Sequence, residues 1–397
     1  MIGKTMHRDR QDAPAATGPG PGADVPANSG QGDKMDAFLS SPPPFVGPRF
    51  DRLLQQLSES SHALEGTDAW PGKQFDELAD AGVLQWSIPE EYGGLTLSPE
   101  QLMYGYERMA TSCLTTTFVL TQRIGACQRI ASSENDEVRQ ELLPALATGD
   151  LFATVGISHL TTSRQHLKQP AVRAEHADGK WILSGTVPWV TGGNRADVIV
   201  TGGTCEDGNQ LLIALPTDLP GVTCQAPPKL LALNASQTGS VELDRVEVDE
   251  RNLLAGPVEG VMNRGQGGGA GSVTTSALAV GLTGRAVEEL QKEASRRDDL
   301  VETVDSLERE RDQLRTDLYA VARGDAVGMF AGEIRQRANS LVLRATQAYL
   351  AASKGAGFVA GHPAERSVRE AMFFLVWSCP QPVLQAALRE FACSLDE

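Results

Sequence analysis

Apolar residues first recur with helical spacing, over residues 49–150. In FDELADAGVLQWSIP they occupy one face of a predicted helix that ends at Gly82. Ser98 followed by Gln101 predicts a capping box at the start of the next helix, SPEQLMYGYERMATSC. SENDEVRQELLPALATGD has the pattern of a further amphipathic helix. The region therefore predicts an N-terminal helical domain.

The apolar period changes to two in residues 151–258. AVRAEHADGKWILSGTVPWV contains two such runs joined by Asp178-Gly179, which predicts a β-hairpin. ADVIVTGGT, NQLLIALP and GSVELDRVEVD continue the strand pattern. Strands and helices do not alternate, and RGQGGGAG follows no strand in the register of a nucleotide-binding loop, so a Rossmann domain is not expected. We expect a compact antiparallel β domain, either open or closed as a barrel.

The pattern is helical again in residues 259–397, which predict a C-terminal helical bundle. Small residues in GGGAGSVTTSALAVGLTGRAVEELQ favour close helix packing. Beyond them an apolar stripe recurs in alternating steps of four and three, interrupted only by Arg311. Its members are Leu300, Val304, Leu307, Leu314, Leu318 and Val321. The stripe is either one face of a bundle helix or part of a coiled coil, and it needs a partner within the chain or in another subunit.

Composition narrows the class of protein. Residues 1–48 are rich in Pro, Gly, Ala and Asp, which predicts a disordered tail. The net charge of −16 argues against nonspecific nucleic-acid binding and against an anionic membrane surface. No apolar run approaches the roughly 20 residues of a membrane span, so membrane insertion is not expected. Without a signal peptide, we expect a cytoplasmic protein with its six cysteines reduced and no metal site.

The segment GKWILSGTVPWVTGGNRAD carries the most specific chemistry. Trp189 and Thr191 stand two residues apart on a predicted strand, which places both on one face. An aromatic wall beside a hydroxyl donor suits a flat, redox-active heterocycle. A Trp and a Thr on one strand face are also a common core pair, so the residues by themselves leave both interpretations open.

This segment resembles the acyl-CoA dehydrogenase family of flavoproteins. Its members carry W-[IV]-[TS]-N-G-x-x-A-D after a G-x-W-x-[IL]-x-G hairpin. FDELADAGVLQWSIPEEYGG looks like the family's N-terminal helix and P-E-x-Y-G-G loop, and LNASQTGSVELDRVEVDERNLLAG looks like its A-S-x-T strand pair. AERSVREA is similar to the family's E-R-x-x-R-D-A segment. The likeness runs in order from about residue 50 to residue 391.

The resemblance implies a multi-domain α+β fold with an N-terminal helical domain, a middle antiparallel β domain and a C-terminal four-helix bundle. It also implies a homodimer or homotetramer with FAD between the middle domain and the bundle. Trp189 would lie beside the flavin, and Thr191 would hydrogen-bond its N5 region. Ser158 or His159 would fall near the Thr of the family's T-E-P-x-A-G-S-D segment. His159 is either an acid/base or a residue that caps a loop.

Two FAD contacts of the family are not recognisable. SRRDDLVETVDSLERERDQ stands in place of the R-x-x-F-G loop, and only Arg296 or Arg297 could serve there. AASKGAG replaces Q-x-x-G-G-x-G, with Ala351 at the Gln position. Gly355 and Gly357 would still allow a close backbone approach to the diphosphate.

The family's catalytic carboxylate is also missing. Dehydrogenation of an acyl thioester needs a base for the α-proton, which the family supplies as the Glu of Y-E-G-T. Here Trp377, Ser378, Cys379 and Pro380 occupy that turn. Some relatives place the Glu on the first long C-terminal helix, but this chain has no carboxylate there before Glu288. A hydroxyl or thiol needs a neighbouring base or cation to act, so the catalytic residue stays unknown.

We therefore predict an FAD-dependent oxidoreductase that acts on an acyl-CoA or a similar acyl substrate. One alternative keeps the fold and the flavin but activates oxygen, as flavin monooxygenases related to this family do without an α-proton base. Another alternative is a non-catalytic relative that uses the fold and its charged helical stripe for assembly.

Overall fold

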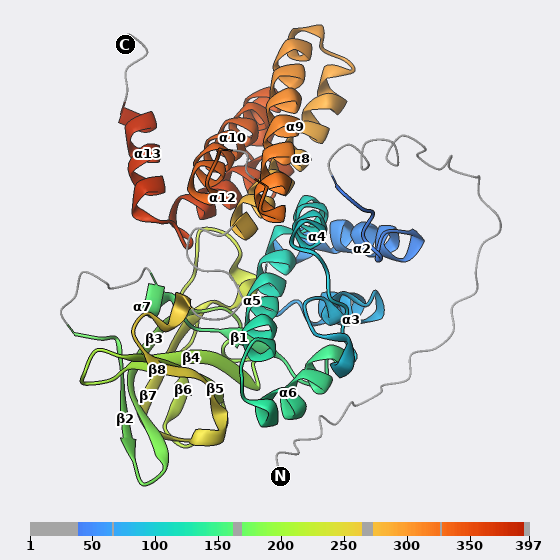
Figure 1. The fold of residues 1–397 in the computed structure, drawn as a ribbon. Coiled ribbons are helices and arrows are strands. Elements are labelled where there is room, and N and C mark those ends of the chain that lie inside the picture. The colour runs from blue at the N-terminus through green and yellow to red at the C-terminus, as the bar shows by residue number, and fades with distance from the viewer. Residues whose placement is uncertain (1–38, 66, 162–168, 264–272, 326–327, 393–397) are drawn as a thin grey trace, which may run out of the picture.

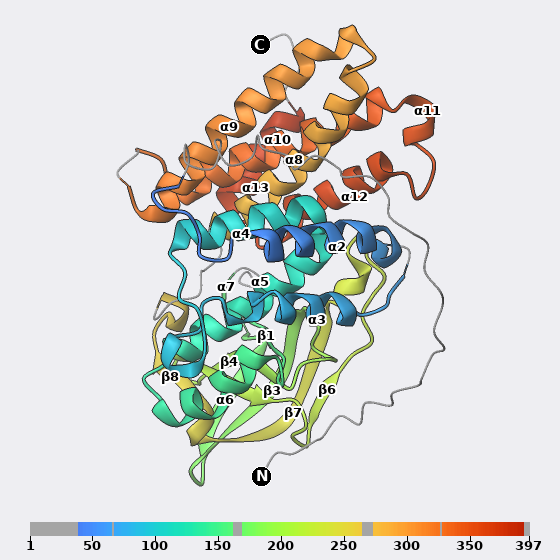
Figure 2. The ribbon, with the colours of Figure 1, turned by 90° about the vertical axis from the view of Figure 1, so that its right-hand side faces the viewer.

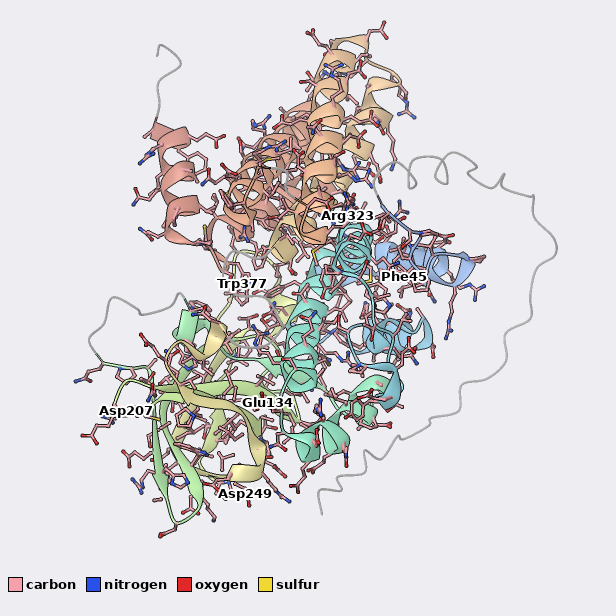
Figure 3. The ribbon with its side chains drawn as sticks, viewed as in Figure 1. Phe45, Glu134, Asp207, Asp249, Arg323 and Trp377 are labelled. Carbon is pink, nitrogen blue, oxygen red and sulfur yellow. The ribbon has the colours of Figure 1, made fainter. Side chains whose placement is uncertain are left out.

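The computed structural model describes residues 39–65, 67–161, 169–263, 273–325 and 328–392. Most of the expected disordered tail, residues 1–38, lies outside this part of the chain. Residues 39–47 are packed instead, because the Phe45 ring contacts Phe50 and Trp86 at centroid distances of 4.9 and 4.4 Å. The prediction of disorder is therefore wrong for this last part of the tail, where Phe45 lies beside the N-terminal helices (Figure 3).

Helices form the first part of the described chain: α2 (Pro48–Glu65), α3 (Gly72–Asp80), α4 (Pro99–Ser112), α5 (Leu114–Ala131) and α6 (Asp136–Thr148). The predicted capping box is confirmed, since Ser98 Oγ accepts from the Gln101 amide and Gln101 Oε1 accepts from the Ser98 amide. Gly82, at φ 78°, follows α3 as predicted. In Figure 2, α2, α4 and α5 lie between the β domain and the C-terminal helices, whereas α6 lies in front of the β domain.

The β domain contains β1 (Ala153–Val155), a short helix α7 (Ser158–Thr161), β2 (Val172–Ala177), β3 (Lys180–Val190), β4 (Val198–Thr204), β5 (Gln210–Pro216), β6 (Val222–Cys224), β7 (Gly239–Asp249) and β8 (Leu253–Val258). The predicted hairpin is confirmed: β2 pairs with β3 across Asp178 and Gly179, both with positive φ. The strand order is β6-β7-β3-β2-β4-β5-β8, an open path rather than a barrel.

The expectation of a purely antiparallel sheet is wrong, because β4 runs parallel to β1 and to β2. In this mixed sheet, the side chains of β4 pack into two different hydrophobic cores. Ile199 packs into a core within the β domain, whereas Val198 and Val200 pack into a second core shared with the N-terminal helices. A strand buried on both faces reads as a continuous apolar run, as VIV does here.

The C-terminal part contains α8 (Val273–Ala294), α9 (Val301–Arg323), α10 (Ala331–Ala352), α11 (Lys354–Gly357), α12 (Pro363–Val376) and α13 (Gln381–Ala392). The apolar stripe lies on α9, which packs against α8, α10 and α4 (Figure 1). Its partner is therefore within the chain, as expected for a face of a bundle helix. Among the described helices, none combines the length and apolar content needed to span a bilayer.

A buried ionic cluster joins α4 and α9. The carboxylate of Glu107 has no exposed surface and accepts hydrogen bonds from Arg311 at 3.1 Å, from Arg315 and from the Tyr319 hydroxyl. Arg311 passes α8 at Gly284, where a Cβ would lie 2.7 Å from its Nη2. The single interruption of the apolar stripe is thus the residue that reaches across α8 to α4.

Two further buried carboxylates join helices, Glu100 at the same α4–α9 interface and Glu370 between α12 and α8. Glu100 of α4 accepts from Ser40 and pairs with Arg323 of α9 at 2.7 Å (Figure 3). Glu370 of α12 pairs with Arg366 of its own helix and with Arg285 of α8. Buried charges are tolerated because each has a partner of opposite sign.

We predict that Glu107→Gln lowers the free energy of unfolding by about 3–5 kcal/mol, because it removes the fully buried carboxylate that pairs with Arg311 and Arg315. The matched control is Glu310→Gln, which breaks the exposed pair with Arg344 and should cost less than about 1 kcal/mol. Urea unfolding followed by circular dichroism measures both variants. Equal losses in the two would contradict a special contribution from Glu107.

The same carboxylate predicts a pH dependence of stability. Burial raises the pKa of Glu107, but Arg315, Arg311 and the Tyr319 hydroxyl lower it further, so the folded pKa lies below the usual value. The stabilisation is therefore complete above the unfolded pKa of about 4.3 and is lost as the pH falls through the lower folded value. Urea midpoints from pH 6 down to pH 3 should fall less steeply for Glu107→Gln than for the parent protein. Parallel pH profiles would refute the assignment.

Candidate functional site

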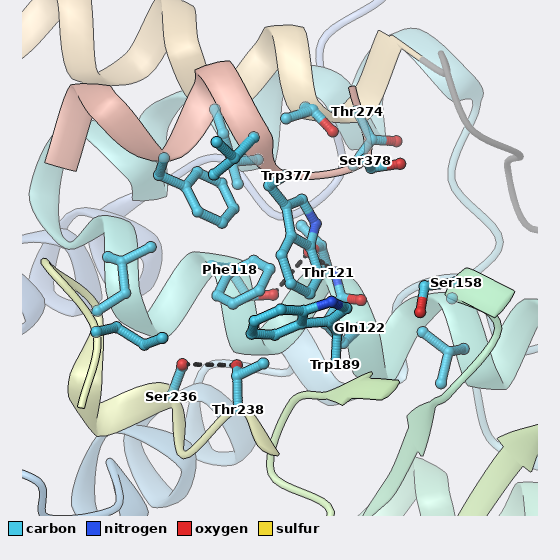
Figure 4. A pocket seen from close by; sticks show the side chains of 18 of the residues that line it. Phe118, Thr121, Gln122, Ser158, Trp189, Ser236, Thr238, Thr274, Trp377 and Ser378 are labelled. Atoms are coloured by element: carbon cyan, nitrogen blue, oxygen red, sulfur yellow. Dashed lines mark hydrogen bonds between the residues drawn. The ribbon is translucent and has the colours of Figure 1, made fainter. Parts of the chain in front are cut away.

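A cavity of about 780 Å³ lies where α5, the β domain and the C-terminal helices meet (Figure 4). Its wall is largely apolar and aromatic and includes Leu102, Tyr106, Phe118, Leu278, Met372 and Phe373. Binding pockets for small molecules and cofactors commonly measure about 300–1,000 Å³. The cavity is therefore large enough for a sizeable organic ligand.

Trp189 forms part of this wall, as predicted, whereas Thr191 does not. The Trp189 side chain is 48% exposed and its backbone has φ 56°, within a register shift between β3 and β7. Thr191 follows the end of the strand and is fully buried. The expectation that the two residues share a face is wrong, because the bulge breaks the alternation of the strand.

Thr191 instead connects to the cavity through other hydroxyls. Its Oγ1 lies 3.0 Å from Thr238 Oγ1, which lies 2.9 Å from Ser236 Oγ. Ser236 and Thr238 both line the cavity and come from the loop before β7 (Figure 4). The sequence offered a signal for these two, since they are the Ser and the Thr of the A-S-x-T match. Their role as cavity hydroxyls depends on the loop conformation.

The two remaining predicted site residues, Ser158 and His159, differ in their position relative to the cavity. Ser158 lines the cavity and donates to the Pro188 carbonyl at 3.0 Å, next to Trp189. His159 is not among the described lining residues, and its Nε2 lies 3.0 Å from the Gly202 carbonyl on β4. The geometry of His159 matches a residue that holds a loop rather than one that faces a ligand.

The turn after α12 brings Trp377 and Ser378 into the wall. The Trp377 ring lies 4.7 Å from Phe118 and 5.5 Å from Phe373, between centroids, and points into the cavity (Figure 4). Ser378 has φ 43° and also lines the cavity. Helix α13 begins at Gln381, so the predicted bend between two helices is confirmed.

A buried arginine that the sequence did not single out fixes this turn. Arg335 of α10 is fully buried, and its Nη2 donates to the carbonyls of Phe374 and Trp377 at 3.2 and 2.9 Å. Its Nε donates to Asn339. Burial raises the pKa of the nearby Cys379 thiol although Arg335 lowers it, so this thiol is no ready nucleophile. Arg335 binds the last carbonyls of α12, which helix geometry leaves unpaired.

The cavity offers no described general base. None of the described residues that line it is Asp, Glu, His, Lys or Cys. The carboxylates of α12 are paired with arginines: Glu365 with Arg369, and Glu370 with Arg366 and Arg285. In the described part of the chain, no group of three His, Cys, Asp or Glu is placed to hold a metal ion.

The segments expected near a diphosphate make contacts within the chain. Arg297 pairs with Asp299 at 2.8 Å and donates to the Ala352 carbonyl at the end of α10. A Cβ on Gly357 would lie 2.6 Å from Ser353 Cβ, so this glycine serves helix packing. Gly355 has open space around it. These contacts are local and do not form a phosphate cradle by themselves.

A helical domain, a mixed β domain and a helical bundle that together enclose an aromatic cavity define the acyl-CoA dehydrogenase class of fold. Residues 53–150 match the family model "Acyl-CoA dehydrogenase, N-terminal domain". The structure is similar to glutaryl-coenzyme A dehydrogenase in complex with glutaryl-CoA, with a TM-score of 0.75, 17% identity, and coverage of 87% of this chain and 96% of that one. It is also similar to the prolyl acyl carrier protein oxidase AnaB, with a TM-score of 0.71, 17% identity, and coverage of 87% and 99%.

Sequence similarity to known proteins agrees with the similarity in fold. An acyl-CoA dehydrogenase of Bacillus subtilis is 22% identical over 81% of this chain and 89% of its own length. The rat mitochondrial short-chain specific acyl-CoA dehydrogenase is 21% identical over 81% and 82%. The probable acyl-CoA dehydrogenase YngJ of Bacillus subtilis is 24% identical, but the match covers 60% of this chain and 64% of that protein. The chain is thus similar to acyl-CoA dehydrogenases in sequence and in fold, and its residues 53–150 match the N-terminal domain of that family.

We predict that filling the cavity at Gly125 of α5 blocks ligand binding. A Cβ there would lie 3.4 Å from Arg129 Nη1 and 3.6 Å from Val155 Cγ1, which leaves room for alanine. Gly125→Ala should therefore keep ligand affinity and gain up to about 1 kcal/mol of stability. Gly125→Phe should weaken hexanoyl-CoA binding about tenfold or more, a loss of about 1.4 kcal/mol. Calorimetric titration of both variants checks this, and equal affinities would show that the ligand binds elsewhere.

Proposed function

We propose that the protein is an FAD-dependent oxidoreductase that acts on an acyl-CoA or a similar acyl substrate bound in this cavity. One observation carries the proposal. A cavity of about 780 Å³ with a half-exposed indole, Trp189, lies at the junction where the family resemblance expects the flavin. We further propose that the protein works as a homodimer or homotetramer.

The residues present fit the ring end of a flavin. Trp189 supplies a flat aromatic face, and Ser236 and Thr238 supply hydroxyls that donate or accept hydrogen bonds. The diphosphate end has weaker support, because Arg297 is engaged within the chain. Bound FAD would supply the hydride acceptor for dehydrogenation, or the activation of oxygen in a monooxygenase.

The apolar wall of the cavity would contribute to this reaction by enclosing the substrate. Phe118, Met372 and Phe373 would surround an acyl chain and exclude water from the reacting atoms. The Trp377–Ser378 turn closes the cavity at the end of α12, where relatives hold their carboxylate. Ser378 there can donate a hydrogen bond to a carbonyl oxygen, but it cannot remove an α-proton without a base.

The lack of a described base favours a second candidate, a flavin-dependent monooxygenase of the same fold. Oxygen activation requires no abstraction of an α-proton by a protein carboxylate. The observation that supports it is the absence of Asp, Glu and His among the described lining residues. The two candidates share the cofactor site and differ in the substrate response.

We predict that Trp189→Ala weakens flavin binding about three- to tenfold, since an aromatic contact contributes about 0.5–1.5 kcal/mol. Trp181→Phe is the matched control, because Trp181 is buried beside His176 within the β domain, away from the cavity. Flavin content of the purified protein and fluorescence titration with FAD measure the effect. If neither protein binds flavin, both enzyme proposals fail and the non-catalytic alternative gains support.

The substrate response then separates the two enzymes. Bleaching of the flavin absorbance by an acyl-CoA without oxygen supports the dehydrogenase. Oxygen consumption by the reduced holoenzyme, with no anaerobic response to acyl-CoA, supports the monooxygenase.

A further inference from the structure

The serine and threonine hydroxyls that line the cavity fall into two groups. The first group already has hydrogen-bond partners within the chain and consists of Thr121, Ser158, Thr161, Ser236 and Thr238. The second group consists of Thr274 and Thr275 of α8 and Ser378 of the turn after α12. In the part of the chain that the structure describes, the hydroxyls of this second group have no hydrogen-bond partner. They are therefore available to a ligand.

The unpaired hydroxyls lie away from those proposed for the flavin. Thr274 and Thr275 precede Leu278 by four and three residues, so they share a face of α8 with this apolar lining residue. Figure 4 shows Thr274 and Ser378 at one end of the cavity, and the hydroxyls proposed for the flavin at the other end. The second group thus belongs to the part of the wall where the substrate, not the cofactor, would lie.

The backbone at Ser378 is held in a conformation that residues other than glycine seldom adopt. Its φ is 43°, and the carbonyl of the preceding Trp377 accepts a hydrogen bond from the buried Arg335 at 2.9 Å. Non-glycine residues in the left-handed region cost free energy, and they cluster at functional sites where the surrounding structure holds them. The Ser378 hydroxyl is therefore fixed in the wall before a ligand arrives, which lowers the entropic cost of binding.

A purely apolar acyl chain would leave this end of the cavity unsatisfied. Methylene groups that cover a hydroxyl remove its water and offer no hydrogen bond in return, which costs free energy. A hydroxyl on the ligand avoids this cost, because it donates one hydrogen bond and accepts others, as serine and threonine hydroxyls also do. A cationic group is disfavoured, since no carboxylate is among the described lining residues.

We propose that Ser378, Thr274 and Thr275 bind a hydroxyl group on the acyl chain, so that the substrate is a hydroxyacyl thioester. This inference rests on the proposed function and names the substrate class of the same cavity. A thioester carbonyl oxygen has two lone pairs, so it cannot satisfy all of these hydroxyls by itself. The apolar and aromatic wall would enclose the rest of the acyl chain.

The test compares thioesters that differ only in one hydroxyl: α-hydroxybutyryl-CoA and β-hydroxybutyryl-CoA with butyryl-CoA, and ω-hydroxyhexanoyl-CoA with hexanoyl-CoA. Anaerobic calorimetric titration of the FAD-loaded protein gives the ratio of the Kd values for each pair. In the parent protein, at least one hydroxyacyl thioester should bind about three- to tenfold more tightly than its unsubstituted partner. The pair with the largest ratio locates the hydroxyl along the chain.

The variants remove one hydroxyl at a time. Ser378→Gly suits the positive φ and removes the hydroxyl without straining the turn, so it should bring the ratio to within about twofold of one. Thr274→Val should reduce the ratio in the same direction, whereas Thr274→Ser keeps a hydroxyl and should keep the preference.

Thr316→Val is the matched control. It removes an exposed hydroxyl of α9 that donates to the Asp312 carbonyl outside the cavity, so it should leave the ratio unchanged. Thermal unfolding and flavin content show whether each variant is folded and loaded.

Ratios near one for every pair in the parent protein would overturn this inference while leaving the oxidoreductase proposal intact. A preference that neither Ser378→Gly nor Thr274→Val changes would overturn it as well. An equal loss of affinity for hydroxylated and unsubstituted thioesters in Ser378→Gly would assign this hydroxyl to the thioester carbonyl instead, which also contradicts the inference. Failure of every thioester to bind would overturn both proposals.

Discussion

The buried carboxylate of Glu107 is the interaction on which the arrangement of the helices depends. It lies on α4, and its partners Arg311, Arg315 and Tyr319 all come from α9, which packs against both α4 and α8. A desolvated charge of this kind is stable only when its partners are in place, so it allows one relative position of these helices. Because α4 continues into α5 and α8 lines the cavity, the same contact sets the shape of the site.

Glycines make this close packing possible. On α8, a Cβ at Gly281 would lie 2.4 Å from the Glu107 carbonyl, and a Cβ at Gly284 would press on Arg311. The two glycines therefore have different effects: Gly281 lets the backbones of α4 and α8 approach each other, and Gly284 leaves space for the Arg311 side chain. Gly125 has a third effect, because its missing side chain leaves open space in the cavity instead of allowing two helices to pack closely.

The turn after α12 still connects two helices, although it lacks the carboxylate that the family resemblance implies at this position. Arg335 binds the carbonyls at the end of α12, and Trp377 packs on Phe118, so the turn is fixed without a carboxylate. At this point the chain thus presents an aromatic wall to the cavity.

Local patterns by themselves determined the helices, the hairpin at Asp178-Gly179 and the capping box at Ser98, because each depends on residues close together in the chain. They also singled out Trp189, and the family resemblance pointed to the turn at Ser378; both residues line the cavity. Only the tertiary structure decided that Thr191 is buried, since one bulge in β3 redirects the strand, and that β4 pairs in parallel with β1. The contacts of Glu107 and Arg335 join residues up to 212 positions apart, and no local spacing encodes such pairs.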